Sequence, residues 1–187
     1  MNFHDTHRHE IDAEAQRILH SIRNMIGAGG RKVLMNVLYA YLKDTTDAMK
    51  EGSSCKGKGC SFCCHDEILM SGLEAEHMKE VLKEAIPHKG RLEVQNLFSY
   101  EDLTFEQKKC SLLDDSGTCT IYDNRPLICR THNSTDKVEL CKEDENGNKQ
   151  FHGQLMAVNV EAIQKALLLE SRGYEPMHKV LNELNNK

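Results

Sequence analysis

Cysteines clustered in one part of the chain constrain its fold more than any other feature. Four of the eight fall within ten residues, in the run Cys55-Lys-Gly-Lys-Gly-Cys60-Ser-Phe-Cys63-Cys64. The other four follow at wider spacing, at Cys110, Cys119, Cys129 and Cys141. A set of thiols confined to the middle of a chain is most simply interpreted as a set of metal ligands. We therefore expect this part of the chain to fold around metal.

The length of the chain allows it to fold without covalent cross-links. Its 187 residues suffice for one domain with a buried core, so disulfides are not required for stability. Residues 1–9 are polar and no long apolar run follows them, so we expect neither a secretory signal nor a membrane span. In the cytoplasm that we then expect, clustered thiols bind metal or perform redox chemistry more often than they form disulfides. A disulfide framework is the less favoured alternative.

The charge of the chain argues against nucleic acid as a partner. The formal net charge of −5 at pH 7 gives no general attraction to a phosphate backbone. We expect a metal ion as partner, with no nucleic acid and no membrane, and the sequence identifies no protein partner.

Apolar residues at helical spacing predict two helices before the cysteines. They recur at steps of three and four over residues 10–26 and again over residues 31–49. Gly27, Gly29 and Gly30 separate the two patterns and are typical of a turn that ends a helix. Two helices joined by a short break usually fold back on one another.

Three of the longer helices are expected after the first cysteine group. Ser71 with Glu74 three residues later is a capping-box signature, which predicts a helix over residues 71–86. Helical apolar spacing over residues 154–172 and 175–184 predicts the last two helices.

The second cysteine group predicts a small β-hairpin. Residues 91–109 before it are weakly patterned, so we expect irregular structure or a short helix there. Two apolar or β-branched runs then flank the turn-forming sequence Asp-Asp-Ser-Gly at residues 114–117. A hairpin over residues 110–122 would place Cys110 and Cys119 opposite each other.

A short helix and a loop should follow the hairpin. The turn-forming sequence Asp-Asn-Arg-Pro ends at Pro126, which suits the first position of a short helix that carries Cys129 and Arg130. Residues 131–149 are polar and predict a loop in which Cys141 is the anchored point.

Together these elements predict a mainly α fold with a small β-hairpin. Residues 1–54 form an N-terminal helical hairpin, and residues 55–141 form a cysteine-cluster metal-binding module with the inserted helix 71–86. Residues 142–187 supply C-terminal helices that pack on the N-terminal ones. We expect one compact domain overall.

Positive charge accompanies the cysteines along the sequence. Only a thiolate binds a soft metal well, and crowded thiolates repel one another, so nearby cations would stabilise them. Six cations lie beside or within the cysteine groups: Lys56, Lys58, Lys108, Lys109, Arg125 and Arg130. Among them we favour Arg130 as a donor to sulfur, because it lies between Cys129 and a loop. An ordinary solvated surface is the other interpretation.

The adjacent pair Cys63 and Cys64 argues against one simple zinc site. Neighbouring side chains in an extended segment point to opposite faces, so one thiol could bind while the other packs, or each could serve a different metal. Two zinc ions with four thiolates each would have a net charge of about −4, which is unfavourable inside a protein. A cluster with bridging ligands, or an iron–sulfur cluster, needs fewer thiolates and would be less unfavourable. The spacing Cys55-x4-Cys60-x2-Cys63 also matches the local pattern of plant-type ferredoxins, to whose fold the later cysteines do not belong.

Two blocks of the sequence resemble a known family. The blocks are Cys55...Cys60-Ser-Phe-Cys63-Cys64 and Cys110-Ser-Leu-Leu-Asp-Asp-Ser-Gly-Thr-Cys119-Thr-Ile-Tyr-Asp-Asn-Arg-Pro-Leu-Ile-Cys129-Arg130. They are similar to the YkgJ-type cysteine-cluster proteins, also described as the CxxCxxCC or zinc- or iron-chelating domain family. The second block, similar to the pattern C...G-x-C-x-I-Y-x-x-R-P-x-x-C-R, is the more specific.

The resemblance implies that the cysteines bind zinc or iron, and it supplies no established activity. The implied ligands are Cys55, Cys60, Cys63, Cys64, Cys110, Cys119, Cys129 and Cys141. It also implies that Arg125, Pro126 and Arg130 belong to the frame of the site. Four residues separate Cys55 from Cys60 where the family name has two.

Two histidines near the cysteines are further candidate ligands. His65 directly follows the adjacent pair and His132 lies three residues after Cys129, so either could complete a coordination sphere. With eight thiols in the chain neither is required.

Three functions remain open on the sequence alone. The first is a metal-binding protein that holds zinc or iron in a mainly structural role. The second is an iron–sulfur oxidoreductase or modifying enzyme, and the third is a zinc-braced adaptor that presents its helices to a protein partner. The chain contains no Ser-His-Asp ordering, nucleotide fingerprint or zinc-protease motif, so no enzyme class follows.

Overall fold

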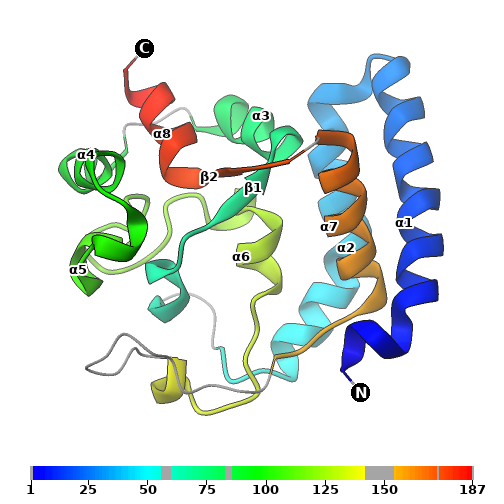
Figure 1. The fold of residues 1–187 in the computed structure, drawn as a ribbon, viewed down its shortest axis with the longest axis horizontal. Helices are drawn as coiled ribbons and strands as arrows, with labels where there is room; N and C mark the ends of the chain where they lie inside the picture. Colours follow the sequence, from blue (N-terminus) through cyan, green and yellow to red (C-terminus); the bar gives the residue numbers. More distant parts are fainter. Residues whose placement is uncertain (1, 56–59, 83–85, 142–153, 172, 187) are drawn as a thin grey trace.

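The computed structural model divides the helices between two sides of the molecule (Figure 1). The long helices α1, α2 and α7 lie on one side, and α3, α4, α5 and α8 lie on the other around a small sheet, with α6 between them. The description covers the whole chain except residues 1, 56–59, 83–85, 142–153, 172 and 187. Within the described chain, no helix has the length and apolar character that a membrane crossing requires.

The helices α1 (Phe3–Gly27) and α7 (Val158–Ser171) pack closely along their lengths. Helix α1 begins seven residues before the predicted start at residue 10, because the side chain of Asn2 caps it by accepting a hydrogen bond from the Asp5 amide at 2.9 Å. Its apolar stripe is buried against α7 and consists of Ile11, Ala15, Ile18, Leu19 and Ile22.

The predicted turn between the first two helices is present. Gly29 adopts a φ of 79°, in the left-handed region that glycine occupies without steric cost. A 3-10 turn, η1 (Gly30–Val33), then leads into α2 (Leu34–Glu51), whose buried face joins the core of α1 and α7. Helix α1 contacts α7 more extensively than it contacts α2.

The sheet pairs two strands that are distant in sequence. Strand β1 (Leu69–Ser71) lies antiparallel to β2 (Tyr174–Pro176), with Met70 opposite Glu175. Each strand leads directly into a helix, β1 into α3 (Gly72–Val81) and β2 into α8 (Met177–Asn185). A mainly α fold with a small antiparallel β element is therefore confirmed.

Helix α8 packs against α4 (Lys89–Leu97) and α3, away from α1. The two C-terminal helices, expected together on the N-terminal ones, thus have different neighbours. The second core lies between these elements and comprises Met70, Ala75, Met78, Ile86, Leu92, Leu112, Met177, Val180 and Leu181.

The capping box at Ser71 and Glu74 is present and starts α3. The helix ends at Val81, and residues 83–85 of the predicted span lie outside the described chain. The weakly patterned stretch that follows contains α4, the turn η3 (Tyr100–Asp102) and the one-turn helix α5 (Phe105–Lys108).

The hairpin predicted over residues 110–122 is reduced to a tight turn with one isolated antiparallel bridge, between Leu113 and Cys119. Cys119 therefore lies opposite Leu113 and not opposite Cys110. The Asp114 amide donates to Thr118 O at 2.9 Å and the Thr120 amide to Leu112 O at 3.0 Å. The pairing goes no further because the Leu113 amide bonds back to Cys110 O at 3.3 Å, and the 3-10 turn η4 (Tyr122–Asn124) ends the second run.

Candidate metal centre

Short segments bring seven of the eight cysteines to two adjoining cavities of about 490 and 110 Å³. Cys60, Cys63 and Cys129 line both cavities, so they lie on the shared wall. Cys55 lines only the larger cavity, and the smaller one is completed by Cys64, Cys110 and Cys119. The 3-10 turn η2 (Phe62–His65) carries the adjacent pair, and α6 (Leu127–Thr131) carries Cys129.

Cys55 lies just after α2, and its sulfur accepts hydrogen bonds from its neighbours. The side chain of Cys60 hydrogen-bonds to it and lowers its pKa to about 5, and the Ser134 amide assists from 3.5 Å. The same bond raises the pKa of Cys60, because the proton that it shares stays on that thiol.

The adjacent thiols of Cys63 and Cys64 contact each other. The expectation that they point to opposite faces assumed an extended segment, whereas η2 is a 3-10 turn, in which consecutive side chains are only about 120° apart. A hydrogen bond with Cys64, followed by burial, raises the pKa of Cys63. The Cys110 amide donates to Cys64 O at 2.7 Å and so fixes the second cysteine group against the first.

Burial dominates the electrostatics of the three remaining thiols in the cavities. It raises the pKa of Cys110 to about 12, and it raises the pKa values of Cys119 and Cys129 as well. Arg125 opposes this rise at Cys119 and Cys129. Free thiols in this environment stay protonated, and a bound cation would be needed to hold them as thiolates.

Cys141 and His65 lie apart from the two cavities. Cys141 is buried at the end of the turn η5 (Val138–Cys141) and lines neither cavity. His65 is buried, donates from Nδ1 to Phe105 O at 2.9 Å and stacks on the Phe105 ring with centroids 3.8 Å apart. His132 lines both cavities, so it is the better placed of the two candidate histidines.

The two arginines of the predicted frame have different roles. Arg125 lies over the Tyr122 ring with its Cζ 3.7 Å from the centroid, and its Nε donates to Tyr122 O at 2.9 Å. Arg130 lies over the Tyr39 ring and donates to the backbone oxygens of Arg125 and Asp123.

The expectation that Arg130 donates to a sulfur is therefore corrected. Its guanidinium extends back across the turn that precedes α6, toward α2. The arginines that lower thiol pKa values are Arg125, at Cys119 and Cys129, and Arg91, at Cys110. Lys56 and Lys58 lie outside the described residues. Neither Lys108 nor Lys109 lines the larger cavity.

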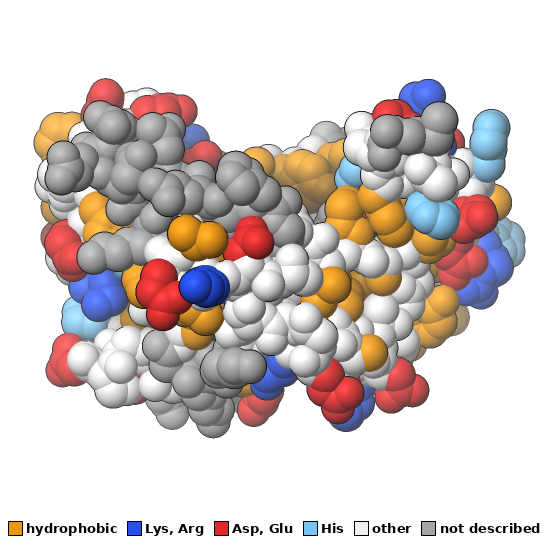
Figure 2. Space-filling view, turned by 90° about the horizontal axis from the view of Figure 1, so that it is seen from below, with side chains coloured by type: hydrophobic (Ala, Val, Ile, Leu, Met, Phe, Trp, Pro, Cys, Tyr) orange, Lys and Arg blue, Asp and Glu red, His pale blue; other side chains and the backbone are white. Residues whose placement is uncertain are grey.

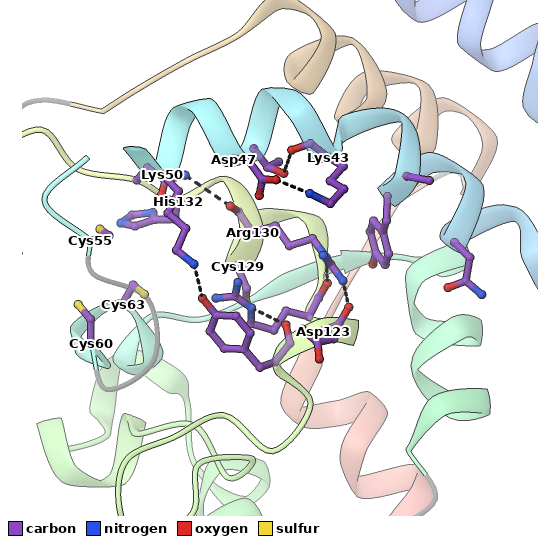
Figure 3. Close-up of a pocket in the computed structure, with 17 residues that line it drawn as sticks. Lys43, Asp47, Lys50, Cys55, Cys60, Cys63, Asp123, Cys129, Arg130 and His132 are labelled. Atoms are coloured by element: carbon purple, nitrogen blue, oxygen red, sulfur yellow. Dashed lines mark hydrogen bonds and ion pairs between the residues drawn. The ribbon is translucent and has the colours of Figure 1, made fainter. Parts of the chain in front are cut away.

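Sequence reasoning missed the contribution of α2 to this site. One face of α2 lines the larger cavity opposite the thiols, with Asn36, Tyr39, Ala40, Lys43, Thr46, Asp47 and Lys50 (Figure 3). The helical spacing of these polar side chains on the face opposite the apolar stripe is the signal that could have identified them.

The chemical nature of the side chains in the cavities fits a soft metal, but their arrangement does not yet form a complete site. Thiolates are the ligands that zinc and iron–sulfur centres use. Among the described residues, however, no three His, Cys, Asp or Glu side chains are arranged to hold one ion. The thiols meet in pairs, as at Cys55 with Cys60 and at Cys63 with Cys64, so side-chain rotation would have to complete any site.

Comparison with known proteins bears on the same part of the chain. No curated protein and no solved structure matches it. A family model, CxxCxxCC, described as "Putative zinc- or iron-chelating domain", matches residues 54–152, which is more than half of the chain and includes every cysteine. The chain therefore belongs to the CxxCxxCC family.

Proposed function

We propose that the protein binds zinc or iron through the thiolates of its clustered cysteines. The observation that carries the proposal is the convergence of seven cysteines, from segments up to 74 residues apart between Cys55 and Cys129, on two cavities that share a wall. A chain that needed only small apolar side chains in these places would gain nothing from thiols at each of them. The family description supports the same chemistry.

Cys60, Cys63 and Cys129 are the proposed central ligands because they face both cavities. A bound dication would compensate the charge of the thiolates and would link η2, the 110–119 turn and α6. In the described part of the chain, the Cys110 amide already joins two of these segments by its bond to Cys64 O. The proposed role is thus structural: metal holds the middle of the chain together.

Metal analysis of the full chain after anaerobic purification tests this proposal. We expect zinc or iron at one or more equivalents, and expect Cys63→Ser and Cys129→Ser to lose most of it. Cys141→Ser is the matched comparison, since it removes a cysteine that lines neither cavity; retention of metal in that variant excludes Cys141 as a ligand. A chain that purifies without metal, and takes up neither ion, contradicts the proposal.

A polynuclear centre is the second candidate, because seven thiols exceed the four ligands of one structural zinc ion. An iron–sulfur cluster in this place would give visible absorption and acid-labile sulfide, and would allow the oxidoreductase function. A colourless protein with zinc alone supports the structural role or the zinc-braced adaptor.

A further inference from the structure

The larger cavity has two chemically different ends. Figure 3 shows the thiols of Cys55, Cys60 and Cys63 at one end and the guanidinium of Arg130 toward the other, with Lys43 above it on α2. The cavity, at about 490 Å³, lies within the range of sites for small molecules and exceeds the space that a metal ion needs.

Positive charge exceeds negative charge around this cavity. Apart from the thiols, the charged side chains in its wall are four cations and two carboxylates: Lys43, Lys50, Arg125, Arg130, Asp47 and Asp123. Lys43 pairs with Asp47, whereas Lys50 donates to the Tyr122 hydroxyl at 3.3 Å. Among the described residues, no ion pair involves Lys50, Arg125 or Arg130.

Aromatic rings and backbone oxygens hold the two guanidinium groups in place. Tyr39 stacks on Arg130 and Tyr122 on Arg125, at 3.9 and 3.7 Å from ring centroid to Cζ. Their hydrogen bonds to backbone oxygens fix the planes further, and among the N–H groups of Arg125 only Nε has an acceptor within the described part of the chain. Half-buried, fixed guanidinium groups are the usual means of recognising carboxylate and phosphate oxygens.

We propose that this cavity binds a small molecule that carries a carboxylate or phosphate group, with Arg130, Lys43 and Lys50 as its anion-binding residues. Figure 3 shows Arg130 and Lys43 toward one end of the cavity and Lys50 nearer the thiol end, so the anionic groups of the molecule lie along the wall that α2 forms. The proposal goes beyond the metal centre and does not require it, because none of the three cations is a metal ligand.

The competing explanation is that these cations neutralise the thiolates. Arg125 fits that explanation, since it acts on Cys119 and Cys129. Lys50, which lies nearer the thiol end in Figure 3, fits it too. Arg130 and Lys43 fit it less well, because Figure 3 places them away from the sulfurs of Cys55, Cys60 and Cys63.

Calorimetric titration of the full chain, as purified with its metal, tests the proposal. Sodium pyrophosphate and sodium citrate serve as phosphate and carboxylate probes at constant ionic strength. We expect one of them to bind saturably, and expect the double variant Lys43→Gln, Lys50→Gln to bind it at least about tenfold more weakly. The matched control is Lys79→Gln, Lys165→Gln, which removes the same charge from two lysines that pair with Glu183 and Asp12 outside the cavity.

Each outcome decides the proposal. Preferred binding of pyrophosphate assigns phosphate chemistry and preferred binding of citrate assigns carboxylate chemistry; either result supports the site. Absence of saturable binding, or equal weakening in both double variants, overturns it. Loss of metal from the Lys43→Gln, Lys50→Gln variant also overturns it, in favour of cations that serve the thiolates. Because metal content is measured separately, a chain without metal that still binds the probe contradicts only the proposed metal function.

Discussion

Glu74 is a single residue on which two helices depend. Its carboxylate accepts from the Ser71 amide and hydroxyl at 2.9 and 2.8 Å, and its second oxygen accepts from the Leu127 amide at the start of α6 at 2.7 Å. The side chain is buried, so these donors have no access to water if it is removed. The capping box was readable from the sequence, but the bond to Leu127, 53 residues away, was not.

Glu74→Ala should therefore destabilise the protein by about 2–4 kcal/mol, since it leaves buried amides unpaired and removes a helix cap. Urea unfolding followed by circular dichroism measures the loss. The exposed capping box of α5 supplies the control, and Gln107→Ala should cost below about 1 kcal/mol. Similar costs for the two variants would mean that the second bond of Glu74 contributes nothing.

His77 should make stability depend on pH. Burial lowers its pKa below that of an exposed histidine, and its buried Nε2 forms no hydrogen bond with the described part of the chain. The unfolded state then binds a proton at a pH where the folded state does not, so stability is full above pH 6.5 and falls as pH falls toward the folded pKa. Among its neighbours, Glu80 opposes this shift and Arg130 adds to it.

Unfolding free energies measured at pH 7 and pH 5 should thus differ less in His77→Phe than in the natural chain. His20→Phe, on the exposed face of α1, serves as the control and should keep the natural pH dependence. An unchanged difference in His77→Phe would assign the acid sensitivity to other groups, such as His178, whose pKa burial also lowers.

At the scale of elements, local signals predicted helices better than strands. The helices with regular apolar spacing were predicted within a few residues, apart from the polar start of α1. The pairing of β1 with β2 could not be predicted, because each strand has three residues and the partners lie more than 100 positions apart. The capping box of Thr104 and Gln107 was a readable signal for α5 that the weak apolar pattern obscured.

The turn over residues 114–118 depends on one glycine. Gly117 has a φ of 78°, and the Asp114 carboxylate accepts from the amides of Ser116 and Thr118 at 2.9 Å each. A Cβ at Gly117 would make only an ordinary contact, 3.9 Å from Ser61 Oγ, so the cost of adding one is conformational.

Gly117→Ala should destabilise the protein by about 1–2 kcal/mol, since an L side chain disfavours the left-handed region. Gly90→Ala is the matched substitution within α4, where a Cβ meets nothing within 4 Å, and it should stabilise by about 0.5–1 kcal/mol. Thermal unfolding of both variants checks the opposite signs, and a stabilising Gly117→Ala would show that the turn relaxes to another conformation.

At the scale of the whole molecule, the two hydrophobic cores differ in the length of the elements that form them. The first joins long helices, α1, α2 and α7, through a continuous set of buried apolar side chains. The second is built on shorter elements, with Cys110 and Ile121 packed at its border.

Charged side chains lie mostly near the edges of the face seen in Figure 2, and hydrophobic ones show nearer its middle. The cysteines predicted which segments come together, because thiols that bind one metal site must converge. The polar face of α2 that lines the larger cavity carries no cysteine, so it became evident only in the folded chain.

Metal removal should consequently loosen one part of the molecule and spare the other. Hydrogen exchange by mass spectrometry, before and after treatment with a strong chelator, should show faster exchange in η2, the 110–119 turn and α6, since their mutual contacts depend on the proposed metal. Exchange in α1 and α7 should change little, because their apolar interface is complete without it. Cys119→Ser should reproduce the chelator pattern in part, whereas Cys141→Ser should not. Uniform loosening of both cores would instead mean that the thiol segments and the long helices unfold as one cooperative unit, and no change after verified metal removal would contradict a structural role for the metal.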